Sequence, residues 1–185
     1  MDAKTIIDLD FRVSKRMTVA EKHGVLRSIA IFFAHSGDSW FWGAALLFVW
    51  LFGDSFWKQW AITVVCSIGV LAILVLLIKR TIRRPRPHGA WGMIYRRTDP
   101  HSFPSGHAAR AFMIAVLATG LGPAWLATLL WIWAPLVALS RVAMGVHYLS
   151  DVLGGLVLGL LAGILMLQLL PSIIQVLSTI FPWLW

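Results

Sequence analysis

Three short polar groups in this chain hold the residue types needed to bind a phosphate and transfer it. They are Lys79 with Arg86, the run Pro104-Ser105-Gly106-His107, and Arg141 with His147 and Asp151. Cationic side chains and a helix N-terminus can hold the oxygens of a phosphoryl group, and a histidine can attack its phosphorus. Each group lies at the end of an apolar run. Simple up-and-down threading of those runs puts all three groups on one face of a membrane.

The second group has the composition of a helix start that could hold an anion. Pro104 is tolerated at a helix N-terminus but not within a helix. Ser105 is then a natural N-cap, and Gly106 would let an anion approach the unpaired backbone N–H groups behind it. His107 would lie on the first turn as a titratable acid. On these residues alone, an ordinary capped helix is an equally good interpretation.

The third group contains a histidine and an aspartate at helical spacing. His147 and Asp151 are four residues apart, so on a helix they share one face. The aspartate could accept the Nδ1–H of the histidine, which would leave Nε2 as a base or nucleophile. The alternative is an interfacial histidine at a helix start with a satisfied aspartate below it.

The composition is that of a membrane protein. The chain has 185 residues, of which 59% are hydrophobic, and a mean hydropathy of +0.79. Its net charge of +8 favours anionic lipid or a phosphorylated substrate as a partner over nucleic acid, because the chain is so apolar. The single cysteine, Cys66, excludes an intramolecular disulfide and a cysteine-based metal cluster. Few, scattered carboxylates offer no metal-ligand set.

The apolar runs predict an all-α integral membrane bundle of about six transmembrane helices, in one domain spanning residues 1–185. Residues 1–23 predict a partly amphipathic segment on the membrane surface, with a disordered tail as the alternative. The first residues lack the order of a cleaved signal peptide, so insertion is expected to rely on the spans themselves. Residues 79–104 predict an extramembrane connection that carries function. The expected apolar runs are 24–34, 39–52, 56–78, 105–121, 124–141 and 147–169.

Prolines and glycines refine the last spans. Pro135 should kink its helix, and Pro171 should end the final one, which leaves residues 172–185 as an apolar interfacial tail. Three glycines at four-residue spacing should allow close helix packing: Gly155, Gly159 and Gly163.

The three groups together resemble the signature of the type 2 phosphatidic acid phosphatase superfamily. Lys79 is followed after six residues by Arg86-Pro87, the run Pro104-Ser105-Gly106-His107 comes next, and Ser140-Arg141 precedes His147 and Asp151. The match holds at every signature position, across residues 79–151. The resemblance is to membrane lipid phosphatases of the bacterial phosphatidylglycerophosphatase B and undecaprenyl-diphosphate phosphatase type.

The resemblance implies a role for each matching residue. Lys79, Arg86 and Arg141 would hold the phosphoryl oxygens, helped by Ser105 and the backbone N–H of Gly106. His147 would form a phosphohistidine, Asp151 would orient it, and His107 would protonate the leaving oxygen and then activate water. No metal or other cofactor is required. Arg110, outside the signature, could touch a second phosphate or a headgroup; otherwise it would reach the interface or pair with Asp151 or Asp99.

The expected activity is hydrolysis of a phosphomonoester or diphosphate on a membrane lipid such as phosphatidic acid, phosphatidylglycerol phosphate or an isoprenyl diphosphate. The alternatives are a non-catalytic membrane protein for lipid binding or transport with a lapsed phosphatase site, and a vanadium-dependent haloperoxidase, a class that is soluble. The resemblance places the site on the periplasmic or extracellular side of the plasma membrane. Both termini are then expected inside, which requires six crossings. Five crossings would leave the basic N-terminus outside, against the positive-inside rule.

Overall fold

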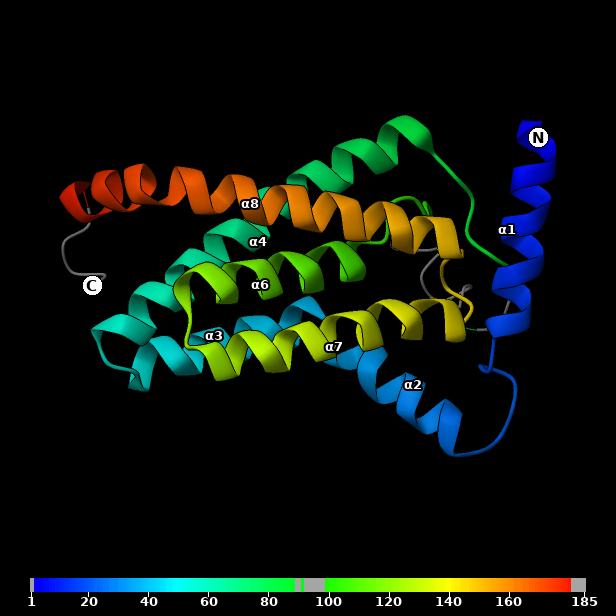
Figure 1. Ribbon diagram of the computed structural model, residues 1–185, viewed down its shortest axis with the longest axis horizontal. Coiled ribbons are helices and arrows are strands. Elements are labelled where there is room, and N and C mark those ends of the chain that lie inside the picture. The colour runs from blue at the N-terminus through cyan, green and yellow to red at the C-terminus, as the bar shows by residue number, and fades with distance from the viewer. Residues whose placement is uncertain (1, 89–90, 92–98, 181–185) are drawn as a thin grey trace.

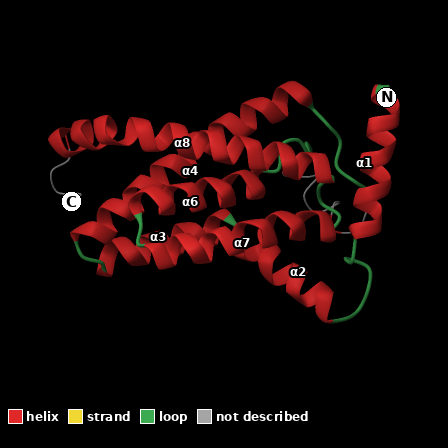
Figure 2. Ribbon diagram, in the orientation of Figure 1, coloured by secondary structure: helices red, strands yellow, loops and turns green. Residues whose placement is uncertain are grey.

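The computed structural model describes residues 2–88, 91 and 99–180, and within these residues every named element is a helix (Figures 1 and 2). The predicted all-α class is therefore confirmed. Seven helices follow one another along the described chain: α1 (Ala3–Met17), α2 (Val25–Ser36), α3 (Ser39–Phe52), α4 (Ser55–Ile82), α6 (Gly106–Leu121), α7 (Ala124–Ala143) and α8 (Leu149–Ile180).

Helix boundaries fall where the sequence supplies caps. Asp54 caps α4 by accepting a hydrogen bond from the backbone N–H of Trp57 at 3.1 Å. Ser105 caps α6 through its hydroxyl, as expected. At the other end of α4, Arg83 adopts a left-handed conformation with φ 52°, which turns the chain out of the helix toward the site.

Helix α6 forms the centre of the bundle. Its residues from Ala108 to Ala118 are all buried, and it packs against α4, α7 and most extensively α8. The glycines of α8 make this contact possible: a Cβ on Gly155 would lie 2.5 Å from the carbonyl oxygen of Ser105, and one on Gly159 would lie 2.2 Å from that of Ala109. The prediction of close packing at these glycines is confirmed.

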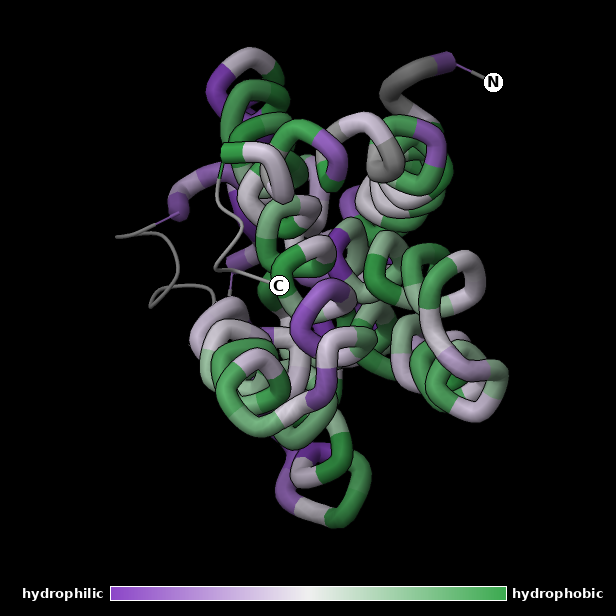
Figure 3. The backbone as a smooth tube through the Cα atoms, turned by 90° about the vertical axis from the view of Figure 1, so that its left-hand side faces the viewer, coloured by the Kyte–Doolittle hydropathy of each residue, from purple (hydrophilic) through white to green (hydrophobic). Residues whose placement is uncertain are grey.

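The outer surface of the bundle is apolar, as a membrane requires. Helices α4 and α7 and the 149–169 part of α8 are long and apolar enough to cross a bilayer, and α2, α3 and α6 are shorter apolar helices. Large hydrophobic side chains such as Ile73 and Leu161 are exposed on these helices. Figure 3 shows hydrophobic residues along the helices of the bundle. The chain is an integral membrane protein.

Helices α2 and α3 together make a single traverse of the bundle. α2 begins beside the end of α7, where Ala30 and Ala34 pack with Met144 and Val146, and its last residue, Ser36, accepts a hydrogen bond from Trp133 midway along α7. α3 then continues to the far end (Figure 1). The start of α1 and the end of α8 therefore lie at opposite ends of the bundle, which differs from the expectation of six crossings with both termini on one face.

Two other expectations concern prolines and the ends of the chain. Helix α8 continues through Pro171 to Ile180, so this proline does not end the helix. An apolar membrane helix tolerates the one backbone hydrogen bond that proline removes. Pro135 lies inside α7. The proposed tail is thus helical over 172–180, and residues 181–185 lie outside the described part. Helix α1 lies across the end of the bundle from which α8 begins (Figure 1).

Candidate active site

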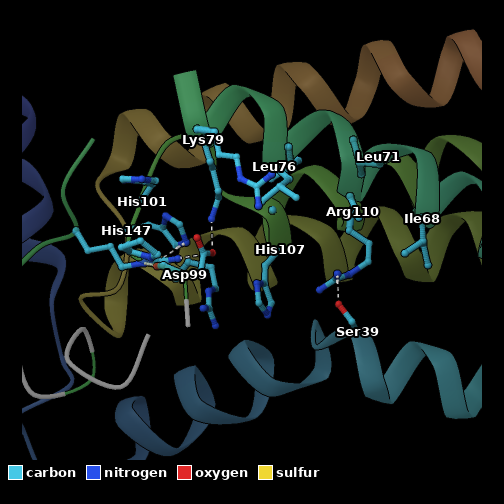
Figure 4. A pocket seen from close by; sticks show the side chains of 17 residues that line it. Ser39, Ile68, Leu71, Leu76, Lys79, Asp99, His101, His107, Arg110 and His147 are labelled. Carbon is cyan, nitrogen blue, oxygen red and sulfur yellow. Dashed lines mark hydrogen bonds and ion pairs between the residues drawn. The ribbon is translucent and has the colours of Figure 1, made fainter. Parts of the chain in front are cut away.

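A cavity of about 420 Å³ opens between α4, α6, the end of α7 and the connection from α4 to α6. Residues from all three sequence groups line it, although they come from different helices (Figure 4). The predicted residues that line it are Lys79, Arg86, Gly106, His107, Arg110, Arg141 and His147. Ser105 and Asp151 are fully buried directly behind this wall.

Lys79 and Arg86 converge on one carboxylate oxygen. The Nη2 of Arg86 donates to Oδ2 of Asp99 at 2.7 Å, and the Nζ of Lys79 donates to the same oxygen. Both cations are almost fully buried, whereas the Asp99 side chain is 40% exposed. Two buried donors aimed at one oxygen make a position suited to an anion. Asp99 was not among the predicted site residues, because its partners lie 20 and 13 residues away in the sequence.

His147 presents an unprotonated nitrogen to these cations. The Nη1 of Arg86 lies 3.0 Å from Nε2 of His147, and a guanidinium can only donate, so Nε2 accepts. Burial and the nearby charges of Arg86, Arg141 and Lys79 hold the pKa of His147 well below its ordinary value of 6.5. His147 is therefore neutral at pH 7, with the lone pair that a nucleophile needs.

The predicted hydrogen bond between His147 and Asp151 is not formed in this structure. Nδ1 of His147 lies 3.6 Å from Oδ2 of Asp151 and is buried without a partner among the described residues. That oxygen instead accepts the backbone N–H of Tyr148 at 2.8 Å. Nδ1 of His147 nevertheless lies within ion-pair distance of the Asp151 carboxylate.

Arg84 connects the catalytic region to the N-terminal helix. Its guanidinium donates to Oδ1 of Asp151 at 2.7 Å and to Oδ2 of Asp10 on α1 at 2.7 Å. Arg84 is therefore held by ion pairs to Asp151 and Asp10. Asp10 also accepts the backbone N–H of Ser150, and Ser14 accepts that of Leu149 at 2.8 Å, so α1 caps the start of α8.

Asp38 is the second residue that the sequence interpretation missed. It lies in the break between α2 and α3, and its Oδ1 is 2.8 Å from Nε2 of His107. Because a carboxylate only accepts, His107 donates from Nε2 and keeps Nδ1 for proton exchange. Gly37 lets this turn approach: a Cβ there would lie 3.2 Å from the ring carbon Cδ2 of His107. The polar run His35-Ser36-Gly37-Asp38 between two apolar helices was the available signal.

The remaining predicted residues complete the wall. Gly106 opens α6 at the cavity, and the backbone N–H of Ser105 donates to the carbonyl oxygen of Asp151 at 2.9 Å. Arg141 is 1% exposed and lines the cavity from the end of α7. Arg110 donates to Ser39 and to the carbonyl of Gly37, so it is not paired with Asp151 or Asp99 as one alternative supposed. Among the described residues, no group of three histidine, cysteine or carboxylate side chains could hold a metal.

The fold and the cavity define a class of protein: a helical membrane protein with a cationic pocket lined by three histidines, His101, His107 and His147. A family model for the PAP2 superfamily matches residues 60–174, and the chain belongs to that superfamily.

Two curated relatives show what similar chains are called. The decaprenylphosphoryl-5-phosphoribose phosphatase of Mycobacterium tuberculosis is 39% identical over 110 residues, which cover 57% of this chain and 58% of that protein. The undecaprenyl-diphosphatase of Sulfolobus acidocaldarius is 30% identical over 138 residues, covering 72% of this chain and 66% of that one. The matches thus span less than two thirds of these relatives' lengths.

Two solved structures share the fold. A transmembrane PAP2-type phosphatidylglycerolphosphate phosphatase from Bacillus subtilis superposes with a TM-score of 0.73 at 24% identity, covering 91% of this chain and 88% of that one. Aquifex aeolicus LpxE superposes with a TM-score of 0.67 at 26% identity, covering 86% and 95%.

Proposed function

We propose that this protein hydrolyses a phosphate or diphosphate group on a membrane lipid, without a metal, through a phosphohistidine. The observation that carries the proposal is the composition of the cavity. His107, His147 and the buried cations Lys79, Arg86 and Arg141 line it, and an apolar face of α4 continues the wall toward Ile68. A lipid whose phosphate meets the cations can keep its tail against this apolar face.

The first step would be attack by Nε2 of His147 on phosphorus. An N–P bond forms while the bond from phosphorus to the leaving oxygen breaks, and that oxygen takes a proton from His107. Lys79, Arg86 and Arg141 would neutralise the charge on the transferring group, with the first-turn N–H groups of α6 behind Ser105 and Gly106. Asp151 would balance the positive charge that develops on the imidazole of His147.

The second step would release phosphate. A water molecule attacks the phosphohistidine, its proton passes to His107, and the N–P bond breaks with return of the electron pair to His147. Asp38 would hold His107 in one orientation through both steps and favour its protonated form. Splitting one displacement into two lets the same pair of histidines serve each of them.

A panel of purified lipid phosphates tests the activity. We expect phosphate release in detergent micelles from at least one of phosphatidic acid, phosphatidylglycerol phosphate and an isoprenyl diphosphate. Release should persist in excess EDTA and vanish in the His147→Ala variant. A folded protein that releases phosphate from none of them would support the alternative of a lipid-binding or transport protein with a lapsed site. A requirement for added divalent metal would contradict the mechanism.

We propose the plasma membrane as the location, with the site on the cytoplasmic face. The resemblance predicts the outward face instead, and that orientation agrees with the positive-inside rule only if the chain makes six crossings. With the start of α1 and the end of α8 at opposite ends, residues 2–27 and 79–88 share a face and carry six and five of the sixteen Lys and Arg residues. Lys58, at the start of α4, belongs to the other face. The positive-inside rule assigns the more basic face to the cytoplasm.

A further inference from the structure

Arg110 is a buried cation with no carboxylate within salt-bridge distance in the described part of the chain, although Asp38, which is paired with His107, lies near enough to interact with its charge. Its side chain lines the cavity, and the residue is 8% exposed. It donates to two neutral acceptors, the hydroxyl of Ser39 at 2.7 Å and the carbonyl of Gly37. Over the part of the chain that the structure describes, it forms no ion pair, and its Nε is buried without a hydrogen-bond partner. A buried charge without a counter-ion is costly, so its position calls for an anionic ligand.

The position of Arg110 along the cavity indicates which anion this is. Arg110 lies one turn beyond His107 on α6, about 4.5 Å further along the helix axis. In Figure 4, Lys79, Asp99 and His147 lie together at one end, His107 lies between them and Arg110, and Ile68 lies beyond Arg110. The order along the cavity is therefore a cationic end with the nucleophile, then the acid, then a second cation, then an apolar wall.

We propose that Arg110 forms a second phosphate subsite, which binds the leaving phosphate of a lipid diphosphate. This rests on the proposed function and names its substrate class. The terminal phosphorus would lie at His147, the bridging oxygen at His107, the second phosphate at Arg110, and the lipid tail along the apolar face of α4. When the N–P bond forms and the bond to the bridging oxygen breaks, the departing lipid monophosphate carries the electron pair, and Arg110 stabilises its charge.

The charge balance of the cavity supports a diphosphate over a monophosphate. Five cationic residues line it, counting Arg110, against the single lining carboxylate of Asp99 in the described part. A phosphomonoester with no second anionic group, such as phosphatidic acid, would leave Arg110 facing an uncharged alkyl ester when its phosphate binds at Lys79 and Arg86. A diphosphate would place its terminal phosphate beside Lys79 and Arg86 and its second phosphate beside Arg110.

The test compares two substrates with the same tail, farnesyl diphosphate and farnesyl monophosphate, in detergent micelles with the purified full chain. The measured quantity is the ratio of kcat/KM for the diphosphate to that for the monophosphate, from initial rates. In Arg110→Gln this ratio should fall about 10- to 100-fold, the range for hydrogen bonds to a charged group. Arg110→Lys keeps the positive charge but lacks the paired N–H donors of a guanidinium. The ratio should therefore fall less in this variant than in Arg110→Gln.

The direction in which the ratio of the two kcat/KM values changes distinguishes a phosphate subsite from a purely structural role of Arg110. If Arg110 only held Gly37 and Ser39, its loss would displace Asp38 and weaken His107 as an acid. The monophosphate needs that acid more, because its leaving group is an alkoxide, so the ratio would stay constant or rise; either result overturns the proposal. Ser39→Ala, which removes a neutral partner of Arg110 but not its charge, should keep the wild-type ratio. If the wild type releases phosphate from phosphatidic acid or phosphatidylglycerol phosphate but from neither farnesyl substrate, the diphosphate proposal fails and the proposed function stands; release from none of these lipids would contradict the proposed function itself.

Discussion

At the scale of single residues, the two histidines of the proposed mechanism each have a carboxylate nearby, at 3.6 Å from His147 and 2.8 Å from His107. Asp151 faces Nδ1 of His147 from four residues away, whereas Asp38 reaches His107 across 69 positions of sequence. Local spacing revealed the first pair. The polar run that contains Asp38 could mark this residue but not its partner, because only the fold brings the α2–α3 break to the start of α6.

Replacing Asp38 should damage proton transfer rather than binding. In Asp38→Asn, protonated His107 loses its negatively charged partner. We therefore expect kcat to fall by roughly 10²-fold, the low end of the range for acid–base catalysis, and the alkaline limb of the pH profile to move to lower pH. The matched control is Asp54→Asn at the far end of the bundle, where asparagine can still cap α4. A loss of the same size in a His107→Ala background would show that Asp38 does not act through His107.

His147 also makes a prediction about pH. Its pKa is held well below 6.5 by burial and by neighbouring cations, so acidification from pH 8 to pH 6 should not protonate the nucleophile. We expect the acid limb of kcat/KM, after correction for ionisation of the substrate's phosphate, to lie well below pH 6.5. An acid limb of kcat/KM at pH 6.5 or above that belongs to the free enzyme would contradict the prediction that His147 is neutral among these cations.

At the scale of helices, the site depends on how closely α8 approaches α6. The glycine spacing on α8 was enough to predict this contact, because small residues along one face of a membrane helix let a neighbouring backbone approach closely. The end of α8 was predicted wrongly, because proline is a weaker stop signal in an apolar helix than in a soluble one. The cap that α1 supplies to α8 could not be predicted, because Asp10 and Ser14 meet their partners 140 and 135 positions away.

A methyl group on Gly159 should separate the two central helices. The added Cβ would meet the backbone carbonyl of Ala109 at 2.2 Å, and backbone cannot give way as a side chain can. Gly159→Ala should cost about 1–3 kcal/mol of stability, measured as thermal unfolding in detergent, and should lower activity by moving α8 relative to Ser105. Gly69→Ala on α4 is the control, since a Cβ there meets nothing within 4 Å. Equal stability of the two variants would contradict close packing at Gly159.

At the scale of the whole molecule, the count of crossings decides which compartment the site faces. The sequence predicted the apolar runs well, but treated the run before His35 as a crossing of its own. The fold joins α2 and α3 into one traverse, because the polar break between them is stabilised inside the bundle by His107 and Arg110. That change brings the two basic regions to one face.

Cysteine labelling measures the orientation directly. In a Cys66→Ser background, His88→Cys places a thiol on the face of the site and Ala124→Cys places one at the opposite end, both at exposed positions. With a membrane-impermeant maleimide, Ala124→Cys should label in intact cells and His88→Cys only after permeabilisation. The reverse pattern would show that the site opens to the outside, as the family resemblance alone suggests.

The most direct test of the mechanism is to locate the phosphate on the enzyme during turnover. A lipid diphosphate labelled in its terminal phosphate is mixed with the protein and quenched within one turnover, and the modified residue is identified by mass spectrometry. We expect an acid-labile, alkali-stable phosphate on His147, which accumulates further in His107→Ala because the second step needs that base. Label on any other residue, or phosphate release by the wild type with no labelled enzyme at any time, would contradict a covalent His147 intermediate.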